Sequence, residues 1–259
     1  MEKPIRINSI DTILLEAAVV FGNSGLDRGT IILVHGITAT MDEGGMYQRL
    51  STSLSNVGFT VVRFSFRGHG KSGGTQEGMT IAGEILDLLS IWNYVKEHSS
   101  APCSIIASSF GAVSTLELIP LLNPTPISIV LWNPVLDLDN TFLNPTLPWG
   151  VENFGNGRLA EMKKKGFILI DNQYRLGQAL WNEFSLYKPL DKLFALTLPN
   201  LIIHGRFDTS VSYEITASAS RMHPLSSLYS VDADHGFSPS SIEDNVIEKT
   251  VGWLTSIYL

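Results

Sequence analysis

Two adjacent serines stand between an apolar run and a glycine in the stretch Ser104–Val113, which reads SIIASSFGAV. A nucleophilic serine at a tight turn between a strand and a helix needs small residues two positions before and after it, because these positions approach each other closely. Around Ser108 these positions hold an isoleucine and a phenylalanine, which are too large. Around Ser109 they hold Ala107 and Gly111, which both fit. The spacing therefore selects Ser109 as the candidate nucleophile, and an ordinary serine at a strand end is the alternative.

The candidate base is His235. A serine hydroxyl is a poor nucleophile until a base takes its proton, and that base needs a carboxylate to orient it. At such a turn the three groups follow one another along the chain in the order serine, acid, histidine. His235 lies in a loop after the last strand-like run, Ser227–Val231. The other histidines fit the role less well: His35 and His204 should be structural, His69 sits in a glycine-rich turn, and His98 and His223 close helix-like segments and should be solvated.

The candidate acid is Asp208, which ends the turn after the strand-like run Leu201–His204. Like the histidine, it follows the carboxyl end of a strand, where an open α/β sheet builds its site. Asp137, after an earlier strand, is the alternative acid, since a carboxylate there could reach the same imidazole. Asp232 and Asp234 are too close to that imidazole in sequence to orient it easily.

Two backbone amides should hold the oxyanion of the reaction. One is the N–H of Phe110, directly after the nucleophile and at the start of its helix. The other should come from the loop His35–Thr38, where we choose the N–H of Ile37. With a helix dipole and two amides directed at one point, the chemistry requires neither a metal nor a cofactor.

The elements that position these groups are short β-branched runs that alternate with longer helical patterns. The strand-like runs cover residues 30–34, 59–64, 103–106, 127–132 and 201–204, and the helix-like segments cover 44–56, 80–97, 110–122, 212–222 and 241–257. Nearly continuous hydrophobicity is typical of parallel strands covered on both faces, and the alternation indicates βαβ units in a doubly wound sheet. The runs Ile5–Ile7 and Thr12–Phe21 predict an antiparallel hairpin at one sheet edge.

One interval, residues 138–190, breaks this alternation. A structureless loop of that length is improbable in a compact domain, so we expect an inserted cap with short elements of its own. The core domain would then comprise residues 1–137 and 191–259. The interval is rich in aromatic residues: Phe142, Trp149, Phe154, Phe167, Tyr174, Trp181, Phe184 and Tyr187. This enrichment favours a packed cap that faces an apolar pocket.

Composition excludes several classes of protein. A net charge of −7 argues against a nucleic-acid-binding surface. The basic triplet Lys163–Lys165 is most simply a solvated turn. The single cysteine, Cys103, cannot form an internal disulfide, and cysteine-based metal sites need several ligands. It lies in an apolar run and should be a buried thiol.

No targeting or membrane-spanning segment is expected. Asp11 and Glu16 interrupt what would have to be the apolar part of a signal peptide. No stretch approaches the roughly 18 consecutive apolar residues of a spanning helix. The default expectation is a cytoplasmic protein whose partner is a small-molecule substrate rather than a membrane or a nucleic acid. A mature form without its leader would look the same, and a homodimer is left open.

Five motifs occur in order along the chain, and together they resemble the α/β-hydrolase superfamily. They are HGITAT (35–40), FRGHGKSGG (66–74), ASSFGA (107–112), IHGRFDTSV (203–211) and ADHGF (233–237). Within that superfamily the chain is similar to small bacterial cinnamoyl and feruloyl esterases, which carry a compact insertion where residues 138–190 stand. The resemblance covers nearly the whole chain. It implies an α/β-hydrolase fold with a mostly parallel, doubly wound sheet of about eight strands and an inserted cap.

The resemblance also implies a carboxylic ester hydrolase that acts through an acyl-enzyme. It assigns Ser109 as nucleophile, Asp208 as acid and His235 as base, with the amides of Ile37 and Phe110 as the oxyanion hole. The aromatic-rich segment hints at a small apolar or aromatic acyl group in the substrate.

Two departures from the family pattern leave alternatives open. Ser65 stands where the family often has an aspartate, which should alter the packing of a turn. Ala107 replaces the first glycine of the turn around the nucleophile, as in acyl-transferring thioesterases of bacterial bioluminescence. A thioesterase or acyltransferase with the same three residues is therefore an alternative function. A ligand receptor on a hydrolase scaffold is an alternative from a different class.

Overall fold

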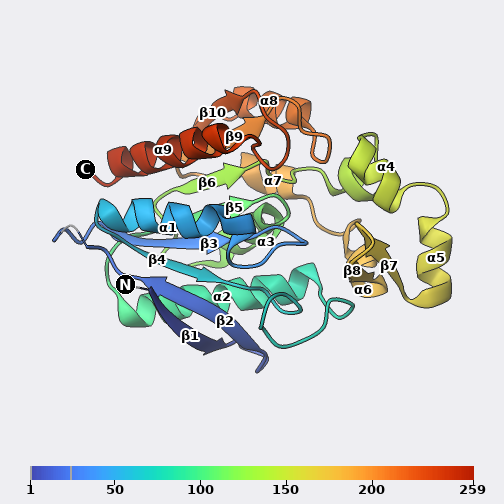
Figure 1. Ribbon diagram of the computed structural model, residues 1–259, viewed down its shortest axis with the longest axis horizontal. Coiled ribbons are helices and arrows are strands. Elements are labelled where there is room, and N and C mark those ends of the chain that lie inside the picture. Colours follow the sequence, from blue (N-terminus) through green and yellow to red (C-terminus); the bar gives the residue numbers. More distant parts are fainter. Residues whose placement is uncertain (1, 24) are drawn as a thin grey trace.

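A central sheet of eight strands runs through the protein in the order β1-β2-β4-β3-β5-β6-β9-β10 (Figure 1). The protein is represented by a computed structural model that describes residues 2–23 and 25–259. The strands are β1 (Glu2–Asn8), β2 (Leu14–Val20), β3 (Gly29–Val34), β4 (Phe59–Phe64), β5 (Cys103–Ser108), β6 (Ile129–Trp132), β9 (Asn200–Gly205) and β10 (Ser226–Val231). The predicted α/β-hydrolase sheet is thereby confirmed, and the predicted edge hairpin is the antiparallel pair β1 and β2.

Six strands of the central sheet, β4, β3, β5, β6, β9 and β10, are parallel to one another, so their carboxyl ends meet at one edge of the sheet. The chain passes from β3 to β4 on one side and then returns to place β5 on the other side of β3. Open α/β sheets bind their ligands in the crevice at such a change of direction. The ends of β3 and β5 therefore mark where a site is expected.

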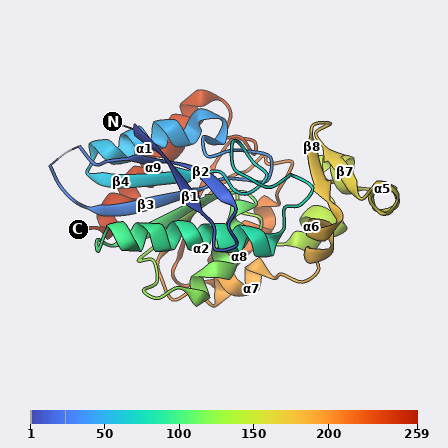
Figure 2. The ribbon, with the colours of Figure 1, turned by 90° about the horizontal axis from the view of Figure 1, so that it is seen from below.

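Helices cover both faces of the sheet (Figures 1 and 2). Helices α1 (Met46–Asn56) and α9 (Ser240–Ile257) pack on one face, and α2 (Ile81–His98), α3 (Gly111–Leu118) and α8 (Tyr213–Met222) pack on the other. The apolar side chains of α2 recur at helical spacing and are buried against the sheet: Leu88, Ile91, Trp92 and Val95. Each such side chain contributes about 1.5–3 kcal/mol of hydrophobic stabilisation.

Between β6 and β9 the chain forms short elements at the carboxyl end of the sheet (Figure 1). They are a π-helical turn (Asp139–Leu143), α4 (Pro148–Phe154), α5 (Arg158–Lys165), the antiparallel pair β7 (Phe167–Ile170) and β8 (Tyr174–Gly177), and α6 (Gln178–Glu183). The chain then forms α7 (Pro189–Phe194), which packs beside α3 on the sheet face that α2 and α8 also cover. We call residues 138–190 the cap and propose it as a separate inserted unit. Its buried aromatic rings share one cluster: Phe142, Phe154, Tyr174, Trp181 and Phe184.

Two local predictions need correction. The triplet Lys163–Lys165 is exposed, as predicted, but it forms the last turn of α5 rather than a turn between elements. Cations are favourable there because they offset the negative end of the helix dipole. The helix predicted over 110–122 ends at Leu118 and continues as a short 3-10 turn that contains Pro120. Within residues 2–23 and 25–259, no helix is both long and apolar enough to cross a membrane.

Candidate active site

Ser109 occupies a strained turn between β5 and α3. Its φ angle is 50°, a left-handed conformation that costs a residue other than glycine about 1 kcal/mol or more. The turn is held by two backbone hydrogen bonds: the Ser109 N–H donates to the carbonyl of Trp132 at 2.8 Å, and the Val135 N–H donates to the carbonyl of Ser109 at 3.0 Å. Held in this way, the turn places the Ser109 hydroxyl beyond the end of the sheet.

Gly111 is required at this turn for a reason that the sequence did not show. A Cβ atom at this position would lie 2.4 Å from the carbonyl oxygen of His35 and 3.0 Å from a methyl group of Val34. Both contacts come from β3 and its following loop. The crowding at Gly111 therefore arises from the neighbouring strand, in addition to any closeness between positions 107 and 111.

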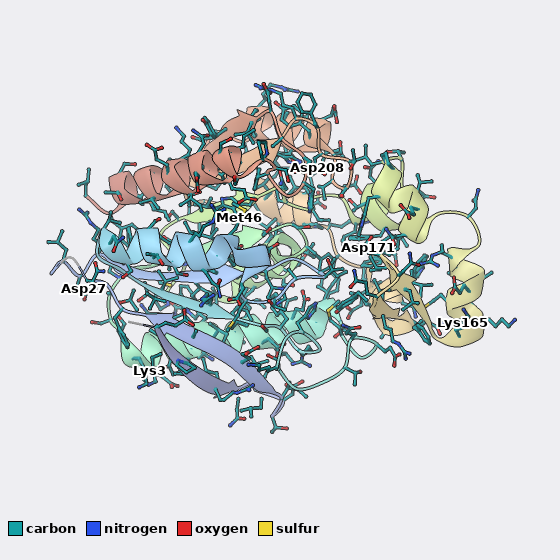
Figure 3. The ribbon with its side chains drawn as sticks, in the orientation of Figure 1. Lys3, Asp27, Met46, Lys165, Asp171 and Asp208 are labelled. Atoms are coloured by element: carbon teal, nitrogen blue, oxygen red, sulfur yellow. The ribbon has the colours of Figure 1, made fainter. Side chains whose placement is uncertain are left out.

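The structure brings the three predicted side chains together. The Nε2 atom of His235 lies 3.0 Å from the Oγ atom of Ser109, and its Nδ1 atom lies 2.7 Å from Oδ2 of Asp208. The other carboxylate oxygen of Asp208 accepts hydrogen bonds from the amides of Ser210 and Val211 at 2.8 and 2.9 Å. Asp208 lies in the loop that follows β9 (Figure 3). One oxygen of the carboxylate is thus held by two backbone amides, while the other oxygen orients the imidazole.

Electrostatics favour an ionised Asp208 beside His235. Burial raises the pKa of Asp208, but the charge of His235 and hydrogen bonds from His204 and His235 lower it well below its usual value. Burial lowers the pKa of His235, but the charge and hydrogen bond of Asp208, with smaller contributions from Glu43 and Asp234, raise it above its usual value. The imidazole is therefore more basic than a free histidine, which suits a general base.

The alternative acids occupy other roles. Asp137 accepts a hydrogen bond from the amide of Asn140, a residue of the π-helical turn, at 3.0 Å. Asp232 pairs with Arg206 at 2.7 Å. Asp234 accepts hydrogen bonds from two amides within the loop that carries the histidine. None of these three carboxylates has a hydrogen bond to the His235 ring in the described part of the chain.

The other histidines follow the predictions with one exception. His35 accepts a hydrogen bond at Nε2 from the Phe66 amide at 2.9 Å, and it is structural as expected. His98 is exposed, as predicted. His223 is buried, so its predicted solvated position is wrong. Its Nε2 lies 3.1 Å from the Leu196 carbonyl, because the end of α8 packs over the chain that leads into β9.

The two amides proposed for the oxyanion hole lie on loops next to Ser109. Ile37 is in the loop after β3, and Phe110 immediately precedes α3. Neither amide has a hydrogen-bond acceptor among residues 2–23 and 25–259. The carbonyl of Ile37 lies 2.6 Å from Nε2 of the buried His69, and this contact helps to hold the loop in place. Two unpaired donors beside a nucleophile are what an oxyanion hole needs.

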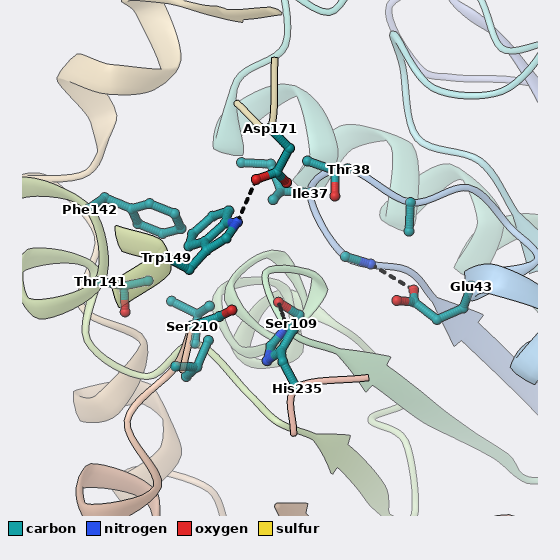
Figure 4. A pocket seen from close by; sticks show the side chains of 14 residues that line it. Ile37, Thr38, Glu43, Ser109, Thr141, Phe142, Trp149, Asp171, Ser210 and His235 are labelled. Carbon is teal, nitrogen blue, oxygen red and sulfur yellow. Dashed lines mark hydrogen bonds between the residues drawn. The ribbon is translucent and has the colours of Figure 1, made fainter. Parts of the chain in front are cut away.

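A cavity of about 170 Å³ opens over the serine (Figure 4). Its walls come from both the core and the cap: Gly36, Ile37, Thr38, Ala39, Glu43, Ser109, Val135, Thr141, Phe142, Trp149, Asp171, Ser210, Val211 and His235. On the cap side, the Trp149 indole donates a hydrogen bond to Asp171 at 2.9 Å. In the described residues, histidine, cysteine and acidic side chains form no group of three that could hold a metal ion.

The family model described as serine aminopeptidase, S33, matches residues 26–177, which is more than half of the chain. The chain belongs to this family. The matched region includes Ser109 and both proposed oxyanion amides, and it ends before Asp208 and His235. No curated protein sequence matches the chain.

Solved structures share the fold of this S33 family member over nearly its whole length. The esterase Est1E from Butyrivibrio proteoclasticus, with bound ferulic acid, has a TM-score of 0.82 at 19 % identity, over 97 % of this chain and 98 % of its own. The mouse α/β hydrolase domain-containing protein 10 has a TM-score of 0.77 at 18 % identity, over 98 % and 99 %. The Pyrococcus furiosus esterase Pf2001 has a TM-score of 0.73 at 23 % identity, over 99 % and 91 %. At these identities the likeness establishes the α/β-hydrolase fold.

Sequence reasoning missed two residues that help to form the candidate site. Asn133 follows β6 with a φ angle of 44°. Its amide nitrogen donates to the carbonyl of His235 at 2.7 Å, and its oxygen accepts from the Gly205 amide at 2.9 Å. Glu43 is the second, and it lines the cavity. An asparagine directly after a strand and an acidic residue before two glycines are the signals that the sequence offered.

Proposed function

We propose that this protein is a serine hydrolase that cleaves a carboxylic ester through an acyl-enzyme. One observation carries the proposal: Ser109, His235 and Asp208 form a continuous hydrogen-bonded chain with separations of 3.0 and 2.7 Å. Membership of a hydrolase family and the esterases among proteins of similar fold support the same reaction class.

Acylation would begin at the serine hydroxyl. The Oγ atom of Ser109 attacks the ester carbonyl while His235 takes its proton, and the carbonyl electron pair moves onto the oxygen. The amides of Ile37 and Phe110 hold that oxyanion. When the tetrahedral intermediate collapses, the bond to the alcohol oxygen breaks and His235 gives its proton to the leaving alcohol.

Deacylation would repeat these steps with water. His235 removes a proton from a water molecule that attacks the acyl carbonyl, and the proton then returns to Ser109 as the acid departs. Throughout the cycle, Asp208 keeps Nδ1 of the imidazole protonated and stabilises the imidazolium that forms.

The cavity supports a small acyl group. Its volume is about 170 Å³, and an apolar protein cavity of about 150 Å³ accommodates benzene. Phe142 and Trp149 supply flat apolar surface on the cap side. The Est1E structure holds ferulic acid, an acid with a single aromatic ring, within a similar fold. We therefore propose a small apolar or aromatic acyl group for the substrate of this protein.

Labelling with a fluorophosphonate tests the proposal directly. We expect the reagent to modify Ser109, as mapped by peptide mass spectrometry. We also expect Ser109→Ala to lower kcat for p-nitrophenyl butyrate by roughly 10⁴–10⁶-fold with little change in thermal stability. Turnover by Ser109→Ala at the wild-type rate would show that the nucleophile is wrong. A panel of aryl esters, acyl-CoA thioesters and amino-acid p-nitroanilides then separates ester from thioester and amide hydrolysis.

A further inference from the structure

Glu43 lies in a strained turn that places its carboxyl group beside the nucleophile. Glu43, Gly44 and Gly45 have φ angles of 44°, 63° and 99°, so three consecutive residues adopt left-handed conformations. Glycine adopts such angles readily, whereas glutamate does so at a cost of about 1 kcal/mol or more. A costly backbone conformation at a site wall indicates that the position of this side chain matters.

The Glu43 carboxylate contacts both segments that meet at the site. Its Oε2 atom accepts a hydrogen bond from the Gly36 amide at 2.9 Å. The hydroxyl of Ser108, the last residue of β5, also lies close enough to this carboxyl group to lower its pKa. In Figure 4, Glu43 lies on the opposite side of Ser109 from Trp149, and so it belongs to the core wall of the cavity.

The surroundings of Gly36 show how close these groups are. A Cβ atom built on Gly36 would lie 3.6 Å from Oγ of Ser109 and 3.7 Å from Oε1 of Glu43. The hydroxyl and the carboxylate thus flank the same backbone position. Burial raises the pKa of Glu43, while the Gly36 amide, the charge of His235 and the Ser108 hydroxyl lower it.

We propose that Glu43 is a positioning residue that joins the two halves of the oxyanion hole. Gly36, which is bonded to the carboxylate, directly precedes Ile37, and Ser108, which lies beside the carboxylate, stands two residues before Phe110. One carboxylate thus links the segments of both proposed oxyanion donors, and we call this link the bridge. The inference rests on the proposed function, because it assigns those two amides to the oxyanion. It also gives each of the paired serines a role: Ser109 is the nucleophile, and Ser108 holds the residue that positions the donors.

The hydrogen bond from the Gly36 amide to Glu43 determines which amide of this loop remains free to bind the oxyanion. Because Glu43 occupies the Gly36 N–H, the next N–H along the loop, that of Ile37, is left to face the cavity. Oxyanion donors act only when they lie about 2.7–3.1 Å from the place where the charge develops. A misplacement of about 1 Å can cost about 100-fold in rate. Loss of the bridge should therefore slow the chemical step and leave substrate binding nearly unchanged.

The test compares three variants with a matched control. Glu43→Ala removes the acceptor, Glu43→Gln removes the charge but keeps an oxygen for the Gly36 amide, and Ser108→Ala removes one half of the bridge. Glu248→Gln makes the same change at an exposed position on α9. The readouts are kcat and KM for p-nitrophenyl butyrate, the rate of fluorophosphonate labelling of Ser109, and thermal stability.

We expect Glu43→Ala to lower both kcat and the labelling rate by about 10–100-fold, with KM within about threefold of wild type. Ser108→Ala should lower the same two rates by about three- to tenfold. Glu43→Gln and Glu248→Gln should stay within about threefold of wild type, because both keep the two segments joined. A rescue by glutamine with unchanged melting temperatures is the signature of positioning.

Two results would overturn the inference. Equal losses in Glu43→Ala and Glu43→Gln would mean that the charge, rather than the bridge, is what matters. Wild-type labelling rates in folded Glu43→Ala would mean that the donors need no such support. If Glu43→Ala does not fold, unchanged rates in Ser108→Ala would overturn the inference in its place. Failure of the wild-type protein to label at Ser109 would instead refute the proposed function, so the two failures are distinguishable.

Discussion

The two walls of the cavity are built in different ways. On the core wall, backbone hydrogen bonds at strand ends fix the side chains: two amides hold Asp208, and Asn133 holds the loop of His235. On the cap wall, packing between aromatic rings fixes the side chains. Phe142 stacks on Phe184 with ring centroids 4.4 Å apart, and Trp149 packs against Phe142 and Phe154.

This difference in construction suits the core wall to the chemical step and the cap wall to substrate recognition. Positions at strand ends are set by the sheet, which tolerates little movement, so the core wall suits groups that must meet within tenths of an ångström. Positions on short helices and a hairpin depend on which side chains fill the cap. The cap is tied to the core by a few polar contacts, among them the hydrogen bond from the Ile81 amide to Glu183 and the ion pair of Arg175 with Glu77.

Replacement of the core carboxylate should have the largest effect. We expect Asp208→Asn to lower kcat by about 10⁴-fold for every ester tested, because the amide stabilises the wrong imidazole tautomer without changing the shape of the site. Steady-state kinetics on acetate, butyrate and benzoate esters measure this. Asp137→Asn, which changes the alternative acid, should stay within about threefold. A loss that depends on the acyl group would contradict the separation of the two walls.

Truncation at the centre of the cap should affect stability more than chemistry. Phe184 is fully buried and contacts both Phe142 of the cap and Phe110 of the core. We expect Phe184→Ala to lower the free energy of unfolding by about 3–5 kcal/mol. Urea denaturation followed by circular dichroism measures the loss, and Phe21→Ala, at a side chain that is 52 % exposed, serves as the control.

The same experiment tests how far the cap is a separate unit. Because one apolar cluster contains residues of the cap together with Phe110 and Val113, we expect a single unfolding transition. Two resolved transitions, with only the first shifted by Phe184→Ala, would instead indicate a cap that unfolds independently of the sheet.

The core could be predicted from sequence because its signals are local. Each buried parallel strand is an apolar run, and the order of motifs follows from the winding of the chain. Ser109, Asp208 and His235 are recognisable because each follows a strand. The structure brings all three within hydrogen-bonding distance of one another along the chain Asp208–His235–Ser109.

The missed features depend on contacts between distant segments. Glu43 reaches the site only because its turn folds back over the ends of β3 and β5, and no periodicity marks a left-handed glutamate. His223 is buried by the chain before β9, which its place at a helix end does not reveal. The elements of the cap are only four to eight residues long, too short for their hydrophobic pattern to separate helix from strand.

Truncation of the cap wall should change selectivity. Trp149 lines the cavity and donates its indole N–H to Asp171. We expect Trp149→Ala to lower kcat/KM for a benzoate or cinnamate ester by about tenfold relative to an acetate ester, because flat apolar contact is lost while the core wall is unchanged. Trp253→Ala, in α9, makes the same change outside the cavity and should leave this ratio unaltered. An equal loss on both esters would mean that the cap serves the chemical step.

The smallest effect should come from a charge near the base. His235 accepts a proton only when its imidazole is neutral, and its pKa is raised, so kcat/KM should fall as pH falls through a midpoint above 6.5. Asp234 is one of the charges that raise this pKa. Asp234→Asn keeps an oxygen for the two loop amides but removes the charge, and the midpoint should move to lower pH.

The shift of the pH midpoint in Asp234→Asn should depend on salt concentration. Asp234 is exposed, so added salt should screen its charge and shrink the difference from wild type. Asp232→Asn is the matched control, because Asp232 pairs with Arg206 and is not among the main groups that raise the pKa of His235. Initial rates on one ester between pH 5 and pH 9, at low and high salt, measure the midpoints. A midpoint that moves to higher pH in Asp234→Asn would show that loop geometry, rather than charge, sets the basicity of the imidazole.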